Sequence, residues 1–422
     1  MLTVALIALL VVGVNTILWT AAAAVRTVGE RIRRPVPAPP GRLGPSDVAV
    51  LVAAHNEELG IATTVRSAAA AVPVDNVFVV SDGSSDETAQ LASEVGATVL
   101  DLRPNRGKAG ALAALIEEFD LAGRFEVVLL LDADTQLSPD YLSTGLPMFD
   151  DPNVVAVAGH AMTLTSPAPA TATGRLLIAY RDRVYVAVQY LQKFGQASRW
   201  INAVSIVPGF ASMYRTRILD RVDIDAPGLT IEDYNMTFEV HAKRLGRIAF
   251  HPGAAIALTQ DPDSLHDYVR QVRRWNLGFW QTVRRHGVHL GRFWAILTLF
   301  ILELVSSSAF VLALLPLLLL SIVATSMVAI GVDHNGVVAA IADILPPWVI
   351  VVGALLPDYV LTVFTAVVTR RPRYLLIGVF FPLLRMLDAA LCLRALVDAF
   401  GRGGDGRWHS PARRAVDVAT RE

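Results

Sequence analysis

Charged side chains are scarce in this chain of 422 residues. Only 18% of the residues are Asp, Glu, Lys or Arg, while 53% are hydrophobic, against about 25% charged residues in an ordinary soluble domain. The 37 Lys+Arg and 38 Asp+Glu leave a formal charge of −1, so the chain lacks the positive field with which many proteins bind nucleic acid. We therefore expect no nucleic-acid partner, and we expect part of the chain to lie in lipid.

Cysteine is nearly absent as well. The single Cys392 lies in an apolar stretch, which excludes an internal disulfide framework and any zinc or iron–sulfur site built from several cysteines. Functional groups must be sought among the other polar side chains.

The N-terminal segment has no charged residue from Leu2 to Val25. At about 1.5 Å per residue, a helix of this length crosses a bilayer core of about 30 Å. A secretory signal peptide is the alternative, because residues 21–24 offer a small-residue cleavage site. Since basic residues follow the run and none precedes it, the positive-inside rule predicts a transmembrane helix over 1–26 with the following residues in the cytoplasm.

A proline-rich stretch follows, and the composition then changes. The prolines within residues 27–46 predict a stiff linker. Over residues 47–260, β-rich runs alternate with Ala-rich helical runs, with strands expected at 48–53, 77–80, 97–100 and 127–131 and helices at 59–71, 88–95 and 109–119. This alternation predicts an α/β, Rossmann-like, mainly parallel sheet covered on both faces, whose sites lie at the carboxyl ends of the strands.

The C-terminal third is expected to meet the membrane. Residues 261–292 have apolar side chains at helical spacing with arginines between them, which predicts an amphipathic pair of helices at the membrane surface. Residues 293–400 contain three apolar segments, at 294–332, 344–368 and 374–400. The first is either one long tilted helix or a tight hairpin, and the charged third segment is expected to be interfacial or re-entrant. The loop 333–343 has no Lys or Arg and is expected outside, and the Arg-rich tail 401–422 inside.

Polar side chains follow the predicted strands. His55, Asn56 and Glu57 follow the first strand and Asp82 follows the second, although both sets could simply cap helices. Asp132 and Asp134 end the fourth strand, where residues i and i+2 project to the same side. Because two adjacent carboxylates repel each other, this pair favours a bound cation, Mg²⁺ or Mn²⁺, over solvated turn acids.

Three further sets carry weaker signals. Lys108 lies at a glycine-flanked helix start and could reach a diphosphate, but the arrangement of a P-loop is missing. Glu232 and Asp233 precede a helical stretch and could be helix-opening acids. Gln271, Arg274 and Trp275 share one helix face, where they could also serve only as membrane anchors.

Taken in order, six motifs resemble those of the family 2 membrane glycosyltransferases, which include the cellulose, chitin and hyaluronan synthases. The motifs are His55-Asn56-Glu57, Ser81-Asp82-Gly83-Ser84, Asn105-Arg106-Gly107-Lys108, Asp132-Ala133-Asp134, Glu232-Asp233 and the Q-x-x-R-W signature at 271–275. The resemblance implies a GT-A fold, with His55, Asn56, Glu57 and Asp82 on the base and ribose of a nucleotide sugar and Lys108 near them. It also implies a D-x-D metal site at Asp132 and Asp134, Asp233 as the general base with Glu232 as the other candidate, and Gln271, Arg274 and Trp275 at the acceptor and the leaving diphosphate.

The resemblance therefore predicts an inverting hexosyl- or N-acetylhexosaminyl-transferase that is a multi-pass protein of the cell membrane, with its catalytic domain in the cytoplasm. The expected donor is a UDP-sugar, and the expected acceptor is a growing glycan that is exported processively. Membrane lipid and a dimer or accessory export subunit are the further expected partners. The alternatives are a non-processive transferase acting on a lipid-linked acceptor and, from another class, a membrane receptor that binds a nucleotide sugar without turning it over.

Overall fold

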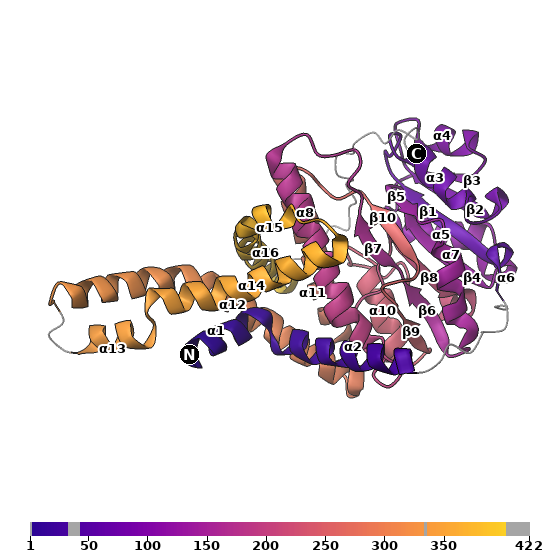
Figure 1. The fold of residues 1–422 in the computed structure, drawn as a ribbon. Coiled ribbons are helices and arrows are strands. Elements are labelled where there is room, and N and C mark those ends of the chain that lie inside the picture. Colours follow the sequence, from indigo (N-terminus) through magenta and orange to yellow (C-terminus); the bar gives the residue numbers. More distant parts are fainter. Residues whose placement is uncertain (1, 33–42, 333–335, 402–422) are drawn as a thin grey trace.

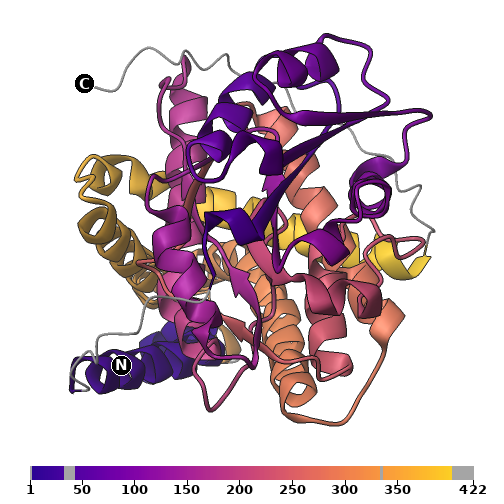
Figure 2. The same cartoon turned by 90° about the vertical axis from the view of Figure 1, so that its right-hand side faces the viewer.

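The structure, a computed structural model, describes residues 2–32, 43–332 and 336–401. The expected proline linker around Pro35–Pro40 and the Arg-rich tail beyond residue 401 lie outside these residues. Figure 1 shows an α/β domain with a long helical arm that projects from it, and Figure 2 shows the same domain in front of the helices.

A seven-stranded sheet forms the centre of the α/β domain, with the strand order β3-β2-β1-β4-β8-β6-β9. Its strands are β1 (Val48–Ala54), β2 (Val77–Asp82), β3 (Thr98–Leu102), β4 (Val127–Asp132), β6 (Val154–Ala158), β8 (Ala211–Arg215) and β9 (Arg247–Ala249). Strands β3, β2, β1 and β4 are parallel, whereas β8 is antiparallel to both β4 and β6. The expected α/β sheet with mainly parallel strands is confirmed, and β8 makes it mixed.

A second, three-stranded sheet lies beside the carboxyl end of β4. It contains β5 (Thr135–Leu137), β10 (Ile256–Thr259) and β7 (His160–Thr163), in that order, with β5 antiparallel and β7 parallel to the central β10. Sequence periodicity did not predict this sheet. Since β5 begins directly after Asp134, the small sheet holds the end of the D-x-D turn in place.

Helices cover both faces of the large sheet, which explains why the central strand β1 is apolar and buried at every position. In β1, Ala49, Leu51 and Ala53 pack in one apolar cluster with helix α5, while the alternate residues Val48 and Val50 pack in a second cluster with helix α3. The helices of the domain are α3 (Ile61–Ala69), α4 (Thr88–Glu94), α5 (Gly107–Glu118), α6 (Leu121–Arg124), α7 (Tyr141–Gly145), α8 (Ala172–Val186), α9 (Phe194–Gln196) and α10 (Asp233–Ala242), and a π-helical stretch, Ala187–Lys193, joins α8 to α9.

The N-terminal helix differs from the single span expected over 1–26. It is broken into α1 (Leu2–Val12) and α2 (Val14–Ile32), which meet at an angle of 76°. Gly13 lies at the break with φ of +88°, and a Cβ there would collide with the carboxylate of Glu303. That carboxylate accepts a hydrogen bond of 2.9 Å from the Asn15 amide at the start of α2, and Arg385 donates to the Val11 carbonyl at the end of α1. Each charged group is thus opposite in sign to the partial charge of the helix end that it contacts.

The two halves of the broken helix contact different parts of the molecule. Helix α1 packs against helix α14 (Pro347–Thr369) through Ile7, and α2 packs on the α/β domain, where Arg26 donates to the carbonyls of Phe194 and Phe250. With about 1.5 Å per residue, the 11 residues of α1 alone extend about half of a 30 Å bilayer core, but α1 and α2 together are long and apolar enough for one broken span or a re-entrant loop.

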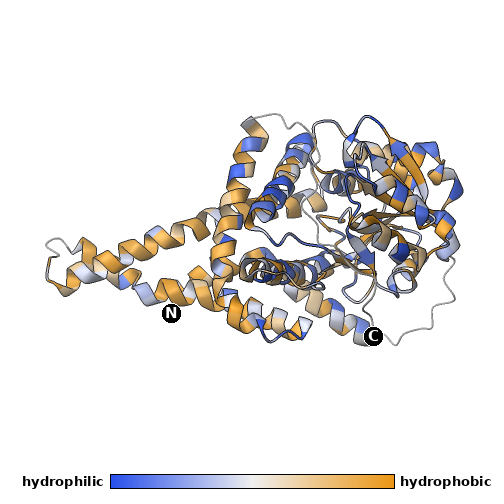
Figure 3. Ribbon diagram, turned by 90° about the horizontal axis from the view of Figure 1, so that it is seen from above, coloured by the Kyte–Doolittle hydropathy of each residue, from blue (hydrophilic) through white to orange (hydrophobic). Residues whose placement is uncertain are grey.

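The C-terminal region is helical throughout its described part. Helix α11 (Leu265–His286) is one continuous helix where the sequence predicted a pair. It is followed by α12 (Arg292–Ala329), α13 (Val337–Ile344), α14 (Pro347–Thr369), α15 (Tyr374–Ile377) and α16 (Phe381–Gly401). Three stretches, Arg292–Ala329, Val337–Thr369 and Tyr374–Gly401, are long and apolar enough to cross a membrane. Helix α12 is one long helix, so the tight hairpin is excluded, and Figure 3 shows that the projecting arm consists mainly of hydrophobic residues.

Candidate active site

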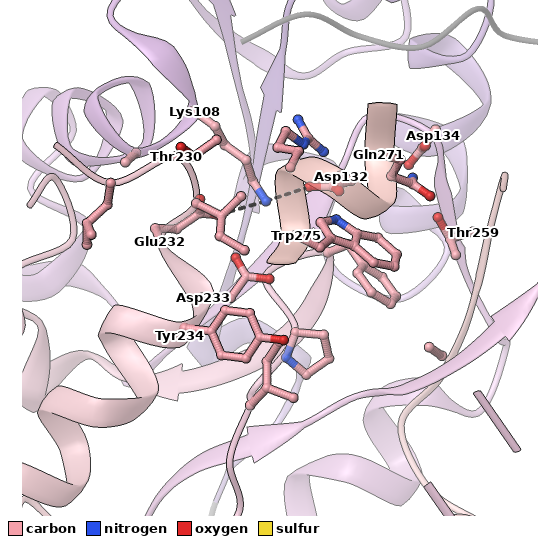
Figure 4. Close-up of a pocket in the computed structure, with 18 of the residues that line it drawn as sticks. Lys108, Asp132, Asp134, Thr230, Glu232, Asp233, Tyr234, Thr259, Gln271 and Trp275 are labelled. Atoms are coloured by element: carbon pink, nitrogen blue, oxygen red, sulfur yellow. Dashed lines mark ion pairs between the residues drawn. The ribbon is translucent and has the colours of Figure 1, made fainter. Parts of the chain in front are cut away.

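One cavity of about 320 Å³ brings together nine of the twelve residues that the sequence singled out. These are Glu57, Lys108, Asp132, Asp134, Glu232, Asp233, Gln271, Arg274 and Trp275. They come from the ends of β1 and β4, the starts of α5 and α10, and one face of α11, and Figure 4 shows most of them around the cavity. Residues separated by more than 200 positions in the chain therefore share one binding space.

Lys108 connects two walls of this cavity. Its Nζ lies 2.8 Å from Asp132 Oδ1 and 2.8 Å from Glu232 Oε1 (Figure 4), and it donates to the carbonyl of Gly209 at 3.3 Å. Although burial favours the neutral amine, the charges of Asp132 and Glu232 raise the pKa of Lys108 well above its usual value. The side chain is therefore a permanent cation that joins the end of β4 to the start of α10.

The adjacent acids Glu232 and Asp233 have different environments. Burial opposes the ionisation of Glu232, but the ion pair with Lys108 outweighs it and lowers the pKa of Glu232. Burial raises the pKa of Asp233 to about 7, the charge of Glu232 adds to this effect, and Lys108 counteracts part of it. Asp233 can therefore bind and release a proton near neutral pH, which is the property that a general base needs.

Gly209 allows these acids to approach the neighbouring loop. Its amide donates to Asp233 Oδ2 at 2.8 Å, and a Cβ on Gly209 would lie 2.6 Å from Asp233 Oδ1 and 2.9 Å from Glu232 Oε1. A larger residue at this position would displace both carboxylates.

Asp132 and Asp134 have the donor chemistry of a site for a divalent cation. Both line the cavity, Asp134 Oδ1 accepts a hydrogen bond of 3.1 Å from the Thr135 hydroxyl, and Asp132 Oδ1 contacts Lys108. Within residues 2–32, 43–332 and 336–401, no group of three or more His, Cys, Asp or Glu side chains is placed to hold a metal ion. The pair fits Mg²⁺ or Mn²⁺, because such an ion can take one or two carboxylates from the protein and its other ligands from phosphate and water.

Three predicted residues, His55, Asn56 and Asp82, lie outside the cavity lining and form a cluster at the ends of β1 and β2. His55 Nδ1 donates to the Asp82 carbonyl at 2.7 Å, and Asn56 Oδ1 accepts from the Ser85 amide at 2.8 Å. Asp82 Oδ1 accepts from the Arg106 amide at 2.7 Å, whereas no hydrogen bond from the described residues reaches the buried Asp82 Oδ2. Burial raises the pKa of Asp82, and the Arg106 hydrogen bond reduces the effect.

Arg181, from α8, is a site residue that sequence reasoning missed. Its Nη2 donates to Gln271 Oε1 at 3.0 Å, and its guanidinium lies 4.5 Å from the centre of the Trp275 ring. Its Nε lies 3.4 Å from Asp261 Oδ1, which also accepts a hydrogen bond of 2.9 Å from the Tyr185 hydroxyl. Arg181 thus contacts two residues of the Q-x-x-R-W signature from the opposite wall of the cavity. Because about 90 residues separate Arg181 from Gln271 in the chain, no local sequence pattern indicates this contact.

The comparison with protein families agrees with this arrangement. The model of the family described as "Glycosyltransferase like family 2" matches residues 45–278 of the chain. The chain belongs to this family. It is accordingly a family 2 glycosyltransferase, and its mixed sheet with mainly parallel strands is the GT-A-like fold that was expected.

Relatives of this glycosyltransferase include a probable glycosyltransferase of Bacillus subtilis, 29% identical over 244 residues that cover 55% of this chain and 54% of the relative. A hyaluronan synthase of Streptococcus pyogenes is 26% identical over 257 residues, or 56% of this chain and 57% of that protein. The chain thus spans about half the length of the curated relatives it matches. Among solved structures, a mannosyltransferase from Pyrobaculum calidifontis in complex with GDP-Man and Mn²⁺ has a TM-score of 0.49 and 16% identity, over 94% of this chain and 99% of that one.

Proposed function

We propose that this family 2 glycosyltransferase is an inverting, metal-dependent membrane enzyme that extends a polysaccharide from a nucleotide sugar, a UDP-sugar, on the cytoplasmic side. The observation that carries the proposal is the position of Asp233. A carboxylate whose pKa is about 7 lies in the same cavity as the paired acids Asp132 and Asp134 and the Trp275 ring. This combination provides a base, a site for a diphosphate with its metal, and a surface for a sugar.

The chemistry follows from these groups. Asp233 accepts the proton of an acceptor hydroxyl, whose oxygen attacks the anomeric carbon from the face opposite the diphosphate. The carbon–oxygen bond to the diphosphate then breaks, and negative charge develops on the leaving group. Lys108 and Arg274 can neutralise part of this charge, and Arg274 Nε is buried without a hydrogen-bond partner within the described residues. A Mg²⁺ or Mn²⁺ ion held by Asp132 and Asp134 would supply further charge stabilisation when bound.

The cluster at the ends of β1 and β2 is proposed to hold the nucleoside. Asp82 Oδ2 is a buried acceptor that receives no hydrogen bond from the described part of the chain, and an N–H of a pyrimidine base could satisfy it. His55, Asn56 and Glu57 would hold the ribose beside it. This assignment places the nucleoside next to Lys108, because the Arg106 amide that contacts Asp82 is two residues from that lysine.

A second cavity supports coupling of transfer to the membrane. This cavity of about 420 Å³ lies among α1, α8, α11, α12, α14 and α16, and it shares Arg181, Tyr234 and Trp275 with the catalytic cavity. Its wall also contains polar side chains, among them Glu303, Ser307 and Gln192, which suit a glycan. The same cavity contains Val11, Leu304 and Leu361, and these apolar side chains favour a lipid-linked acceptor as the second candidate. A dimer or an accessory export subunit would complete either pathway.

The test is to incubate membranes that carry the protein with a panel of labelled UDP-sugars and Mg²⁺ or Mn²⁺, and to size the products. One donor that yields large, glycosidase-sensitive material supports the processive polysaccharide synthase. Small product that partitions into organic solvent supports the lipid-directed transferase instead. Absence of transfer from every nucleotide sugar, with membranes that contain folded protein, contradicts both.

A further inference from the structure

Lysine is used at few positions in this protein, and two of them lie in the catalytic cavity. Of the 37 Lys+Arg residues only three are lysines, namely Lys108, Lys193 and Lys243. Lys108 and Lys193 line the cavity, and Lys243 lies at the surface, where it pairs with Glu239. Lys108 has two carboxylate partners and a proposed role. Lys193 has no role in the proposed transfer.

The side chain of Lys193 is largely buried at the cavity wall, and none of the described residues forms an ion pair with it. The residue is only 5% exposed, and within the part of the chain that the structure describes no hydrogen bond or ion pair reaches its Nζ. Burial lowers the pKa of Lys193 to about 8, and the charge of Asp233 reduces this effect, so the side chain is mostly a cation at neutral pH. A buried cation is costly unless a partner compensates it. A ligand that enters the cavity can provide this partner.

Lys193 is also placed by an unusual backbone. It ends the π-helical stretch Ala187–Lys193, and such turns occur frequently at functional sites. Its Nζ lies 5.4 Å from the centre of the Phe250 ring, and nearby His160 has a pKa lowered to about 4, chiefly by burial, so it is neutral at pH 7. The surroundings of Lys193 therefore hold its side chain in place without neutralising its charge.

The position of Lys193 relative to Asp233 indicates which part of the ligand it meets. Asp233 is the acid whose charge acts on Lys193, whereas Asp132 and Glu232 act on Lys108 together with Asp233. Lys193 thus lies on the side of the proposed base, away from the proposed diphosphate site. A general base contacts the acceptor hydroxyl beside the anomeric carbon of the donor. The group that reaches Lys193 must therefore belong to one of the two sugars.

We propose that Lys193 binds a carboxylate on one of the two sugars, so that the site selects an acidic sugar, such as a uronic acid, as donor or as acceptor. This inference rests on the proposed transfer from a nucleotide sugar. A neutral sugar would leave the ammonium without a counterion, whereas a carboxylate satisfies it with a charge-assisted hydrogen bond. The expected selection of an acidic sugar therefore follows from the buried side chain of Lys193.

The experiment measures ligand binding by the purified full-length protein with Mg²⁺ or Mn²⁺. In the donor arm, UDP-glucose and UDP-glucuronate compete with labelled UDP. In the acceptor arm, glucose-terminated and glucuronate-terminated oligosaccharides bind to the UDP-loaded protein. We expect the acidic ligand to bind at least about tenfold more tightly in one arm, the usual size of a hydrogen bond to a charged group. The arm in which the preference occurs identifies the acidic sugar as donor or acceptor.

Variants at the three lysines test the assignment. Lys193→Met keeps the length of the side chain without its charge. In this variant the ratio of the affinities for the acidic and the neutral ligand should fall to nearly one, and the affinity for UDP should stay unchanged. Lys193→Arg keeps the charge and should retain part of the preference, and Lys243→Met is the matched control that should behave as wild type. Equal binding of acidic and neutral ligands by the wild-type protein in both arms overturns the inference, whether or not any variant folds. Retention of the full preference in Lys193→Met also overturns it. A protein that does not bind UDP at all instead contradicts the proposed function.

Discussion

Lys108 Nζ lies 2.8 Å from Glu232 Oε1, and this ion pair separates the properties of two adjacent acids. Glu232 is held as a carboxylate with a lowered pKa, and its charge, together with burial, raises the pKa of Asp233 to about 7. Two acids that follow each other in the sequence therefore differ in the pH at which they bind a proton. This difference favours Asp233 as the base and Glu232 as a structural partner of Lys108.

Replacing Asp233 with Asn should abolish most of the transfer. The amide keeps the size of the side chain but cannot accept the proton of the acceptor, and loss of a general base costs about 10²–10⁴-fold in rate. Affinity for UDP should change little, because the proposed nucleotide contacts do not include Asp233. Asp75→Asn, at an exposed acid, is the control. Polymer synthesis at the normal rate in Asp233→Asn would show that Asp233 is only a helix-opening acid.

Replacing Glu232 with Gln should move the pH dependence of the reaction. Because a base acts in its deprotonated form, kcat/KM of the wild type should fall as the pH decreases below about 7, the pKa of Asp233. The Gln side chain removes the negative charge that raises this pKa, so the acidic limb should shift to lower pH. The measurement is kcat/KM between pH 5 and 9, with the exposed Glu117→Gln as control. Complete loss of activity at every pH, with UDP binding intact, would instead assign the base to Glu232.

The acids at the end of β4 lead to a prediction about metal. Asp134→Asn removes a proposed metal ligand without changing its shape, so transfer and metal-dependent nucleotide binding should both be lost. The exposed Asp101→Asn should behave as wild type. The measurements are product formation and UDP binding with and without EDTA. Full activity in EDTA would falsify the metal assignment.

Trp275→Ala should separate binding of the acceptor from transfer to water. The substitution removes the ring that lies 4.5 Å from the Arg181 guanidinium, while Asp233 stays in place. We expect polymer synthesis to fall by about tenfold or more, the effect of losing roughly 1.4 kcal/mol of binding, and hydrolysis of the donor by water to persist. Both products can be followed from one labelled donor. An equal loss of both reactions would contradict a role in acceptor binding.

Labelling of introduced cysteines tests the membrane topology. The native Cys392 is buried, so its background reaction should be small. A cysteine at the exposed Ser46 should resist an impermeant thiol reagent in intact cells and react after lysis, because the α/β domain is expected in the cytoplasm. A cysteine at Val337, which is 60% exposed at the start of the stretch Val337–Thr369, should react in intact cells, because residues 333–343 are expected outside. The reverse pattern would invert the topology and separate the enzyme from cytoplasmic nucleotide sugars.

The sequence by itself determined the first half of the α/β domain and most of the site. The four strands β1 to β4 are short, mainly apolar runs bounded by turns, and a helix follows each of β1, β2 and β3, so local pattern and connection order suffice to predict them. Their polar ends then had to meet at one edge of a parallel sheet. For this reason Glu57, Lys108, Asp132 and Asp134 could be predicted together.

Only the tertiary structure decided the remaining features. The antiparallel strand β8 and the small sheet join segments that are distant in the chain, and short strands carry little signal of their partners. The N-terminal helix breaks because Glu303, 288 residues away, caps the start of α2. Arg181 contacts Gln271 across 90 residues, and Lys193 lines the cavity at the end of the π-helical stretch. Such contacts depend on how whole elements pack, and the local sequence does not encode them.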